Sequence, residues 1–161
     1  MEPLQFSMLM HFLGIGIVFA ALIAGWLVNA SYRKAEDYRT KAIILRAMRP
    51  IGLLLPVAIT VLLATGIANM SVLAYGWFTT AWLSAKVALF LVAAAAGVVF
   101  GIGGARRTRL VAQIAEGSSP GDAENTLRRM DGRHQLFYII QSLLILAILG
   151  LSVYKPGQYG T

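Results

Sequence analysis

Two ionisable side chains, His11 and Lys86, lie inside long apolar stretches of the sequence and are the residues best placed to do chemistry. A neutral imidazole and a neutral amine each offer a nitrogen lone pair, and a histidine is a common axial ligand of haem iron. A purely structural interpretation stands beside this one. In it, His11 is a hydrogen-bonded polar residue and the Lys86 amine reaches toward a polar interface.

Few other side chains add to this pair. His134 is the only other histidine, and the absence of cysteine excludes disulfides, cysteine-ligated zinc, iron–sulfur clusters and covalent c-type haem attachment. A metal site built from several histidines and carboxylates is therefore not predicted. Thioether sulfur selects copper(I), so a weak copper site with His11 is a further hypothesis, although methionine is also a common gap-filling residue. Its sulfur ligands would be Met1, Met8, Met10 and Met70.

The composition shows what kind of environment surrounds these residues. Of the 161 residues, 58% are hydrophobic and 13% are charged, and the mean hydropathy is +0.70. Soluble globular chains average about 25% charged residues. The apolar excess must therefore face something other than water, and a lipid bilayer is the predicted partner.

Four segments are each long and apolar enough to cross a bilayer, which takes about 20 residues of helix. They cover about residues 6–29, 50–68, 79–104 and 135–153, and Lys86 is the only formal charge within them. The predicted fold is all-α: a polytopic membrane protein forming a four-transmembrane-helix bundle as one domain, residues 1–161.

The basic residues predict how this bundle is oriented. Twelve of the fourteen lie in two segments, residues 30–49 and 105–134. They are Arg33, Lys34, Arg39, Lys41, Arg46, Arg49, Arg106, Arg107, Arg109, Arg128, Arg129 and Arg133. The positive-inside rule places both loops in the cytoplasm and both termini outside. No aromatic-interleaved basic motif accompanies these residues, so nucleic acid is not a predicted partner despite the net charge of +7.

This topology places His11 and Lys86 at similar depths. At 1.5 Å per residue, both lie roughly 8 to 12 Å inside the outer end of their spans. A lysine in hydrocarbon costs about 2.5 to 3.5 kcal/mol on insertion scales, so it is normally paired, directed to the interface or functional. No carboxylate lies in a predicted span to pair with Lys86. His134 lies at the opposite side, so a haem ligated by both histidines is not predicted.

Small residues recur at four-residue spacing in two spans, at Ala21 and Gly25 in the first and at Ala93, Gly97 and Gly101 in the third. Such faces let helix backbones approach closely in lipid. They are compatible with packing inside the bundle, with homo-oligomers or with membrane protein partners.

Four short motifs, together with a layout of spans and loops that matches over nearly the whole chain, give it a resemblance to a known superfamily. They are MHFLG at residues 10–14, LRAMRP at 45–50, ATG at 64–66 and WLSAK at 82–86. The layout resembles a superfamily of small bacterial four-helix membrane proteins that includes the membrane protoporphyrinogen IX oxidase of haem synthesis and the copper-resistance D domain. The resemblance implies residence in the bacterial inner membrane.

In the oxidase branch, a histidine of the first helix and a lysine of the third are implicated in function, and haem b is bound. The matching positions here are His11 and Lys86. The chain departs from that branch at residues 18–22, where the sequence VFAAL replaces the tryptophan and tyrosine–proline–arginine stretch, and in its third span, which has no second histidine. Whether the chain is an enzyme therefore stays open at this point.

Three hypotheses follow. The first is a b-type haem or porphyrin held between the first and third spans, with His11 as axial ligand and Lys86 as second ligand or propionate partner, acting in electron transfer or porphyrin oxidation. The second is a non-catalytic subunit or scaffold of a larger membrane complex. The third is copper handling.

Overall fold

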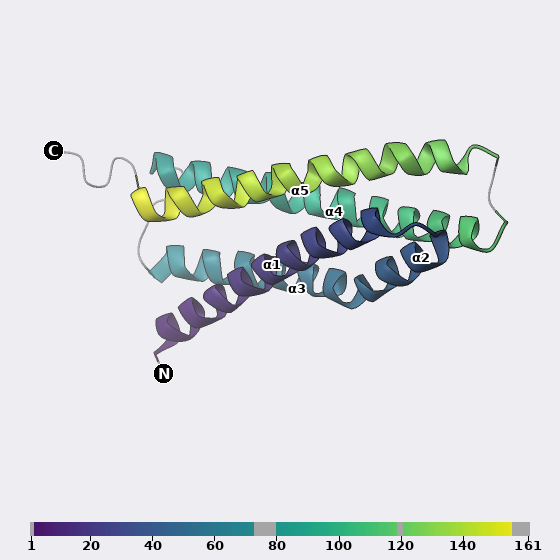
Figure 1. Ribbon diagram of the computed structural model, residues 1–161. Coiled ribbons are helices and arrows are strands. Elements are labelled where there is room, and N and C mark those ends of the chain that lie inside the picture. Colours follow the sequence, from purple (N-terminus) through teal and green to yellow (C-terminus); the bar gives the residue numbers. More distant parts are fainter. Residues whose placement is uncertain (1, 73–79, 119–120, 156–161) are drawn as a thin grey trace.

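The computed structural model describes residues 2–72, 80–118 and 121–155, and all regular elements in these ranges are helices (Figure 1). They are α1 (Pro3–Lys34), α2 (Tyr38–Ala47), α3 (Arg49–Val72), α4 (Ala81–Ala115) and α5 (Ala123–Tyr154). Taking α2 and α3 together as one segment, four segments are long and apolar enough to cross a membrane, with mean hydropathies of 2.2 to 2.4. The predicted all-α, four-span bundle is confirmed.

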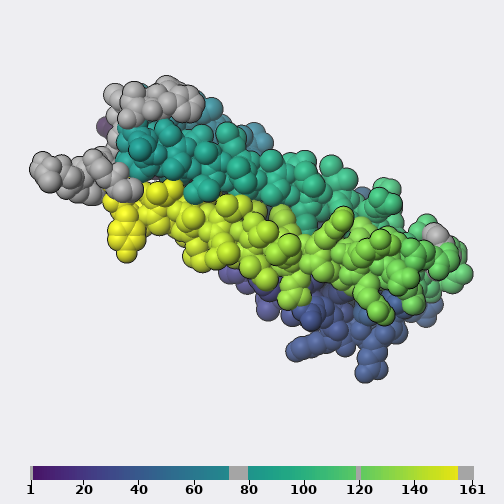
Figure 2. Space-filling model, turned by 90° about the horizontal axis from the view of Figure 1, so that it is seen from above, coloured from purple at the N-terminus to yellow at the C-terminus, as the bar shows by residue number. Residues whose placement is uncertain are grey.

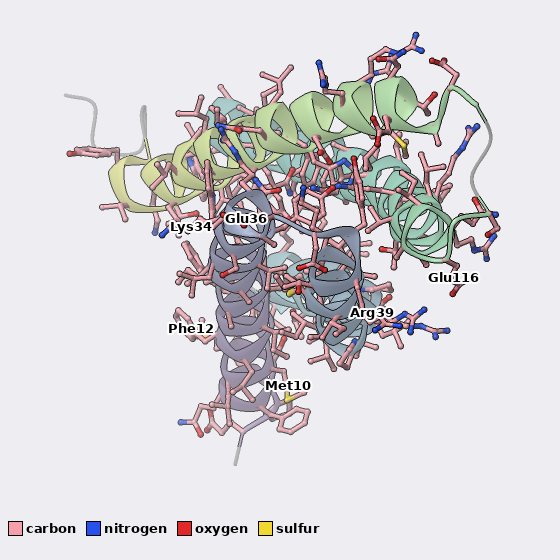
Figure 3. All side chains as sticks on the ribbon, turned by 45° about the vertical axis from the view of Figure 1, so that its right-hand side comes forward. Met10, Phe12, Lys34, Glu36, Arg39 and Glu116 are labelled. Atoms are coloured by element: carbon pink, nitrogen blue, oxygen red, sulfur yellow. The ribbon has the colours of Figure 1, made fainter. Side chains whose placement is uncertain are left out.

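The bundle consists of two helix pairs, because α1 packs mainly on α3 and α4 packs mainly on α5. The helix α1 begins and α5 ends at one end of the bundle, here named the Pro3 end. At the opposite end, the Lys34 end, α1 stops, α5 starts and α2 packs against α4. Toward the Pro3 end, α1 leads away from α5 in two views (Figures 1 and 3). The two pairs are therefore joined mainly at the Lys34 end.

The helices extend beyond the predicted spans because charged residues end an apolar run without interrupting backbone hydrogen bonding. The predicted basic segment at 105–134 consists largely of the end of α4 and the beginning of α5. The predicted segment at 30–49 contains α2. Asp37 caps α2 by accepting a hydrogen bond from the backbone N–H of Thr40 at 2.8 Å.

A hydrophobic cluster of buried residues lies at the Lys34 end. Its fully enclosed members come from α1, α2, α4 and α5 and are Tyr32, Ala42, Val111 and Leu127. Figure 2 shows the blue segment that contains α2 beside α5 at this end of the elongated molecule. Large side chains along the apolar spans, by contrast, are often exposed, as Phe12 is at 68% and Val99 at 71%. This exposure fits helices whose outer faces meet lipid rather than water.

Three of the small-residue positions lie where helices pack closely. Gly25 of α1 lies against Tyr138 of α5, and Ala21 of α1 and Ala93 of α4 are buried. Gly97 and Gly101 have no heavy atom within 4 Å of the place a Cβ would take, once neighbouring residues and their own helix backbone are set aside. The predicted close packing therefore applies to Ala21, Gly25 and Ala93, whereas the positions at Gly97 and Gly101 are open.

Candidate functional site

His11 lies on α1 and is partly buried against α3, which holds its ring through one strong contact. Its Nδ1 atom lies 2.8 Å from the hydroxyl oxygen of Thr65. A Cβ added to Gly66 would lie 3.9 Å from the His11 Cε1 atom, an ordinary van der Waals distance, so the ring lies beside this residue of α3. The close packing of α1 on α3 is set nearby, where Gly14 meets the Leu62 side chain.

The partners of Thr65 determine which His11 nitrogen carries the proton. The Thr65 hydroxyl donates its single proton to the backbone carbonyl of Val61 at 2.6 Å. Its oxygen is then an acceptor toward His11, so Nδ1 is the protonated nitrogen and donates to Thr65. Nε2 of the neutral ring consequently keeps its lone pair, which is the arrangement of a metal-ligating histidine held by a hydrogen bond on its other nitrogen.

Further polar groups surround this hydrogen bond. The Ser7 hydroxyl donates to the backbone carbonyl of Thr65 at 3.4 Å. One turn beyond Thr65, the Oδ1 atom of Asn69 is buried and has no hydrogen-bond partner in the described part of the chain. The contact between α1 and α3 therefore carries a polar strip through an otherwise apolar region. Nearby on α1, Met10 and Phe12 point in different directions, with Phe12 directed away from the bundle (Figure 3).

Lys86 lies on α4 and is partly buried. It interacts electrostatically with His11, so the predicted pair occupies the same region of the bundle. In residues 2–72, 80–118 and 121–155, Lys86 makes neither a hydrogen bond nor an ion pair. A second amine, that of Lys155, lies 5.9 Å from the centre of the Trp82 ring. Trp82 precedes Lys86 by one helical turn, and the Lys155 amine interacts electrostatically with Lys86. His11 and Lys86 therefore interact electrostatically, although they lie on helices that belong to different pairs.

The donor set at this site is small. Among the described residues, no three His, Asp or Glu side chains gather closely enough to hold a metal ion. The nitrogen of His11 and the amine of Lys86 are the groups that suit a cofactor requiring one or two axial ligands. Of the methionines considered for copper, Met8 is exposed, Met10 and Met70 are partly buried, and Met1 lies outside the described residues.

A second polar cluster lies at the Lys34 end and was missed by the sequence reasoning. Arg107 of α4 is 3% exposed, and its Nε donates to the Asp131 carboxylate of α5 at 2.7 Å. The Tyr32 hydroxyl of α1 donates to the other carboxylate oxygen at 3.2 Å, and the Arg107 guanidinium lies 4.0 Å from the centre of the Tyr32 ring. These three side chains connect α1, α4 and α5.

His134 belongs to this second cluster. Its Nδ1 donates to the backbone carbonyl of Met130 at 2.9 Å, one turn earlier in α5. Phe100 packs on the His134 ring at 4.1 Å between centroids and stacks on Phe137 at 3.5 Å. The side chain is 6% exposed, and its Nε2 faces the position where a Gly104 side chain would begin. The His134 ring is therefore enclosed between α4 and α5.

The two histidines lie at different levels of the bundle. Gly25 contacts Tyr138, and Trp26 donates to the Ser142 hydroxyl at 3.2 Å, which aligns α1 with α5. His11 lies roughly 20 Å along α1 from Gly25 toward the Pro3 end, at 1.5 Å per residue. His134 lies one turn from Tyr138 in the opposite direction. The expectation that one haem does not bind both histidines agrees with this geometry.

Trp26 also helps fix this alignment. Its ring centre lies 5.7 Å from that of Tyr138, and its indole N–H donates a hydrogen bond to Ser142.

No family model, curated protein or solved structure matches the chain. The candidate site is therefore defined by its own geometry: a ring-oriented His11 and a neighbouring Lys86 in the Pro3 half of the bundle.

Proposed function

We propose that this integral membrane protein holds a b-type haem or porphyrin against His11 and acts in electron transfer or porphyrin oxidation. The observation that carries the proposal is the Val61–Thr65–His11 hydrogen-bond chain, which leaves the His11 Nε2 lone pair available. The resemblance to the bacterial superfamily with a functional histidine and lysine adds support. We further propose that the chain resides in the bacterial inner membrane with both termini outside.

The residues present fit such a group in their chemistry. His11 Nε2 would be the axial ligand, and a bound haem would supply one-electron chemistry at its iron. Thr65 would keep the imidazole in one tautomer and orientation, which also raises the basicity of the ligand. Lys86 would place an amine near the same region, either as a second ligand or as the charge partner of a propionate carboxylate.

The location between the helix pairs also favours a large planar ligand. Because α1 packs on α3 and α4 packs on α5, His11 and Lys86 approach any shared ligand from different pairs. A porphyrin offers two faces and two carboxylates, so it suits ligands that arrive from different helices. Haem binding distinguishes this function from the two alternatives, a non-catalytic membrane subunit and copper handling.

The test is haem binding by the purified protein in detergent micelles, followed through the Soret absorption band. Thr65→Val removes the acceptor for His11 Nδ1 and should weaken haem affinity about 10- to 100-fold, the usual effect of losing such a supporting hydrogen bond. Thr60→Val is the matched control, because the Thr60 hydroxyl makes the same type of bond to its own helix, to the Pro56 carbonyl at 2.9 Å, without touching a histidine. It should bind haem as the parent protein does.

Histidine variants locate the ligand. His11→Ala should abolish the specific spectrum, while His134→Gln should retain it. A parent protein that shows no Soret band after expression with haem precursor, or a spectrum unchanged by His11→Ala, would overturn the assignment. A colourless protein that co-purifies with stoichiometric partners would support the non-catalytic subunit hypothesis instead, and copper(I) binding lost on methionine substitution would support copper handling.

A further inference from the structure

The buried cluster at the Lys34 end contains two polar atoms that lack hydrogen-bond partners. They are Nη2 of Arg107 and Nε2 of His134, and neither has a partner in the described part of the chain. Both residues are almost fully enclosed, at 3% and 6% exposed. Buried polar groups are nearly always hydrogen-bonded, because leaving them unpaired forfeits their interaction with water. Two such atoms in one cluster therefore point to a bound partner.

Arg107 and His134 belong to the two packed helices α4 and α5. A Cβ added to Gly104 would lie 3.6 Å from His134 Nε2, so the His134 ring edge is directed at the α4 surface. Gly104 precedes Arg107 by three residues, and residues at this spacing share one face of a helix. Arg107 also interacts electrostatically with His134. The missing side chain of Gly104 supplies the space beside the nitrogen.

The chemistry of the two atoms is complementary. An arginine nitrogen can only donate hydrogen bonds. His134 donates from Nδ1 to the Met130 carbonyl, so its Nε2 can only accept. One partner for both must accept from Arg107 and donate to His134. A fully deprotonated anion has no proton to donate, and a further negative charge has no counterpart here because Asp131 already neutralises the guanidinium.

We propose that a single ordered water molecule bridges Arg107 Nη2 and His134 Nε2. Water accepts and donates at once, and it is small enough for a space that a glycine leaves open. A small hydroxyl compound shares this chemistry and is separated from water by the experiment below. With the water in place, one hydrogen-bonded network runs from Tyr32 through Asp131 and Arg107 to His134.

This network gives the site a structural consequence. It links α1 to both helices of the other pair at the end where the two pairs meet. Through the water, the hydrogen bonds between Arg107 and α5 include His134 as well as Asp131, which lies one turn earlier in α5. The proposal concerns this cluster alone and is independent of the haem proposal, since it uses neither His11 nor Lys86.

The test is solid-state NMR of the full chain in lipid bilayers with ¹⁵N-labelled histidine. The chain has two histidines, so His11→Ala assigns the His134 signals by elimination. We expect a protonated Nδ1, an unprotonated Nε2, and magnetisation transfer from water protons to Nε2. Transfer from arginine protons in place of water, or a protonated Nε2 at neutral pH, would overturn the proposal. Transfer from a proton that is not at the water frequency would identify a hydroxyl compound and would overturn it equally.

Two variants test the bridge. Arg107→Lys retains the positive charge opposite Asp131 but removes Nη2, so the water signal at Nε2 should fall several-fold. Gly101→Ala is the matched control, because it adds a methyl group one turn from Gly104 where no heavy atom lies within 4 Å. Its water signal should equal that of the parent protein. An unchanged signal in Arg107→Lys would show that Arg107 does not hold the water.

Discussion

The contact of Gly25 with Tyr138 yields a sharp prediction about how the helix pairs are held together. A Cβ at residue 25 would lie 2.5 Å from Cε1, 2.9 Å from the hydroxyl oxygen and 3.0 Å from Cζ of Tyr138. The Tyr138 ring is confined by Trp26 at 5.7 Å and Phe100 at 5.6 Å between centroids. Since all three close atoms belong to a confined ring, Gly25→Ala must displace α1 from α5.

The size of the effect follows from two opposing contributions. Adding a methyl group to a tightly packed position typically costs 1–3 kcal/mol, at about 2 kcal/mol here. Replacing glycine by alanine within a helix returns up to about 1 kcal/mol of helix propensity. The free energy of unfolding should therefore fall by about 1 to 2 kcal/mol, which raises the ratio of unfolded to folded protein roughly 5- to 30-fold.

Reversible unfolding in mixed detergent micelles, followed by tryptophan fluorescence, measures this change. Gly101→Ala is the control, since its methyl group meets nothing within 4 Å and should leave stability equal or slightly raised. Tyr138→Leu should recover part of the loss in the Gly25→Ala background, because the close atoms are removed. Equal stabilities for Gly25→Ala and Gly101→Ala would refute the reasoning.

Three further predictions concern the Lys34 end and the topology. Asp131→Ala leaves the Arg107 guanidinium buried without its carboxylate and should lower the free energy of unfolding by about 3 kcal/mol in the same assay. The backbone hydrogen bond that Asp37 accepts holds the pKa of its carboxyl below the ordinary value of about 3.9. The carboxylate's stabilisation of α2 is therefore fully present above about pH 3.9 and is lost as the pH falls through the pKa of the folded state. Amide hydrogen exchange in α2 should therefore become faster in acid in the parent protein, and should depend less on pH in Asp37→Asn. Reporters fused after Arg49 and at Thr161 should lie in the cytoplasm and outside, respectively.

Each of these has a clear contrary result. Stability that is unchanged in Asp131→Ala would mean that the ion pair does not secure Arg107, and the double change Arg107→Met with Asp131→Leu should recover most of the loss. Exchange in α2 that responds to acid equally in the parent and Asp37→Asn, after correction for intrinsic rates, would remove the capping carboxylate as the cause. Reporters on the same side would reject the proposed topology.

The fold class could be predicted because lipid imposes a simple rule on the sequence. A span must hydrogen-bond its own backbone and avoid charge, so long apolar runs mark helices directly. The ends of the helices could not be placed this way, since α4 continues through Arg106, Arg107 and Arg109 as an ordinary helix. The helix α2 did leave a local signal, because Asp37 precedes a short amphipathic segment with one buried alanine, Ala42.

The candidate site was predictable in part for a similar reason. His11 and Lys86 are conspicuous because polar groups are rare in the spans, and the bundle places them near enough to interact electrostatically, without a direct contact between them. Thr65 was not predictable as the partner of His11, because it lies on another helix and its register depends on how α1 packs on α3. Arg107 was counted only as a topology signal, and its buried pairing with Asp131 arises from the antiparallel packing of α4 and α5.

The division into helix pairs leads to a last prediction about the haem proposal. A ligand held by His11 and Lys86 would connect the two pairs in the Pro3 half of the bundle, away from the packing of α2 on α4 at the Lys34 end. Binding to the folded state alone should raise the free energy of unfolding by about 2.7 kcal/mol when free haem is 100 times its Kd. Lys86→Met should keep part of this gain, because His11 remains, whereas His11→Ala should lose it and so correct for haem dissolved in the micelle. If haem stabilises His11→Ala as much as the parent protein, the ligand does not join the pairs through His11.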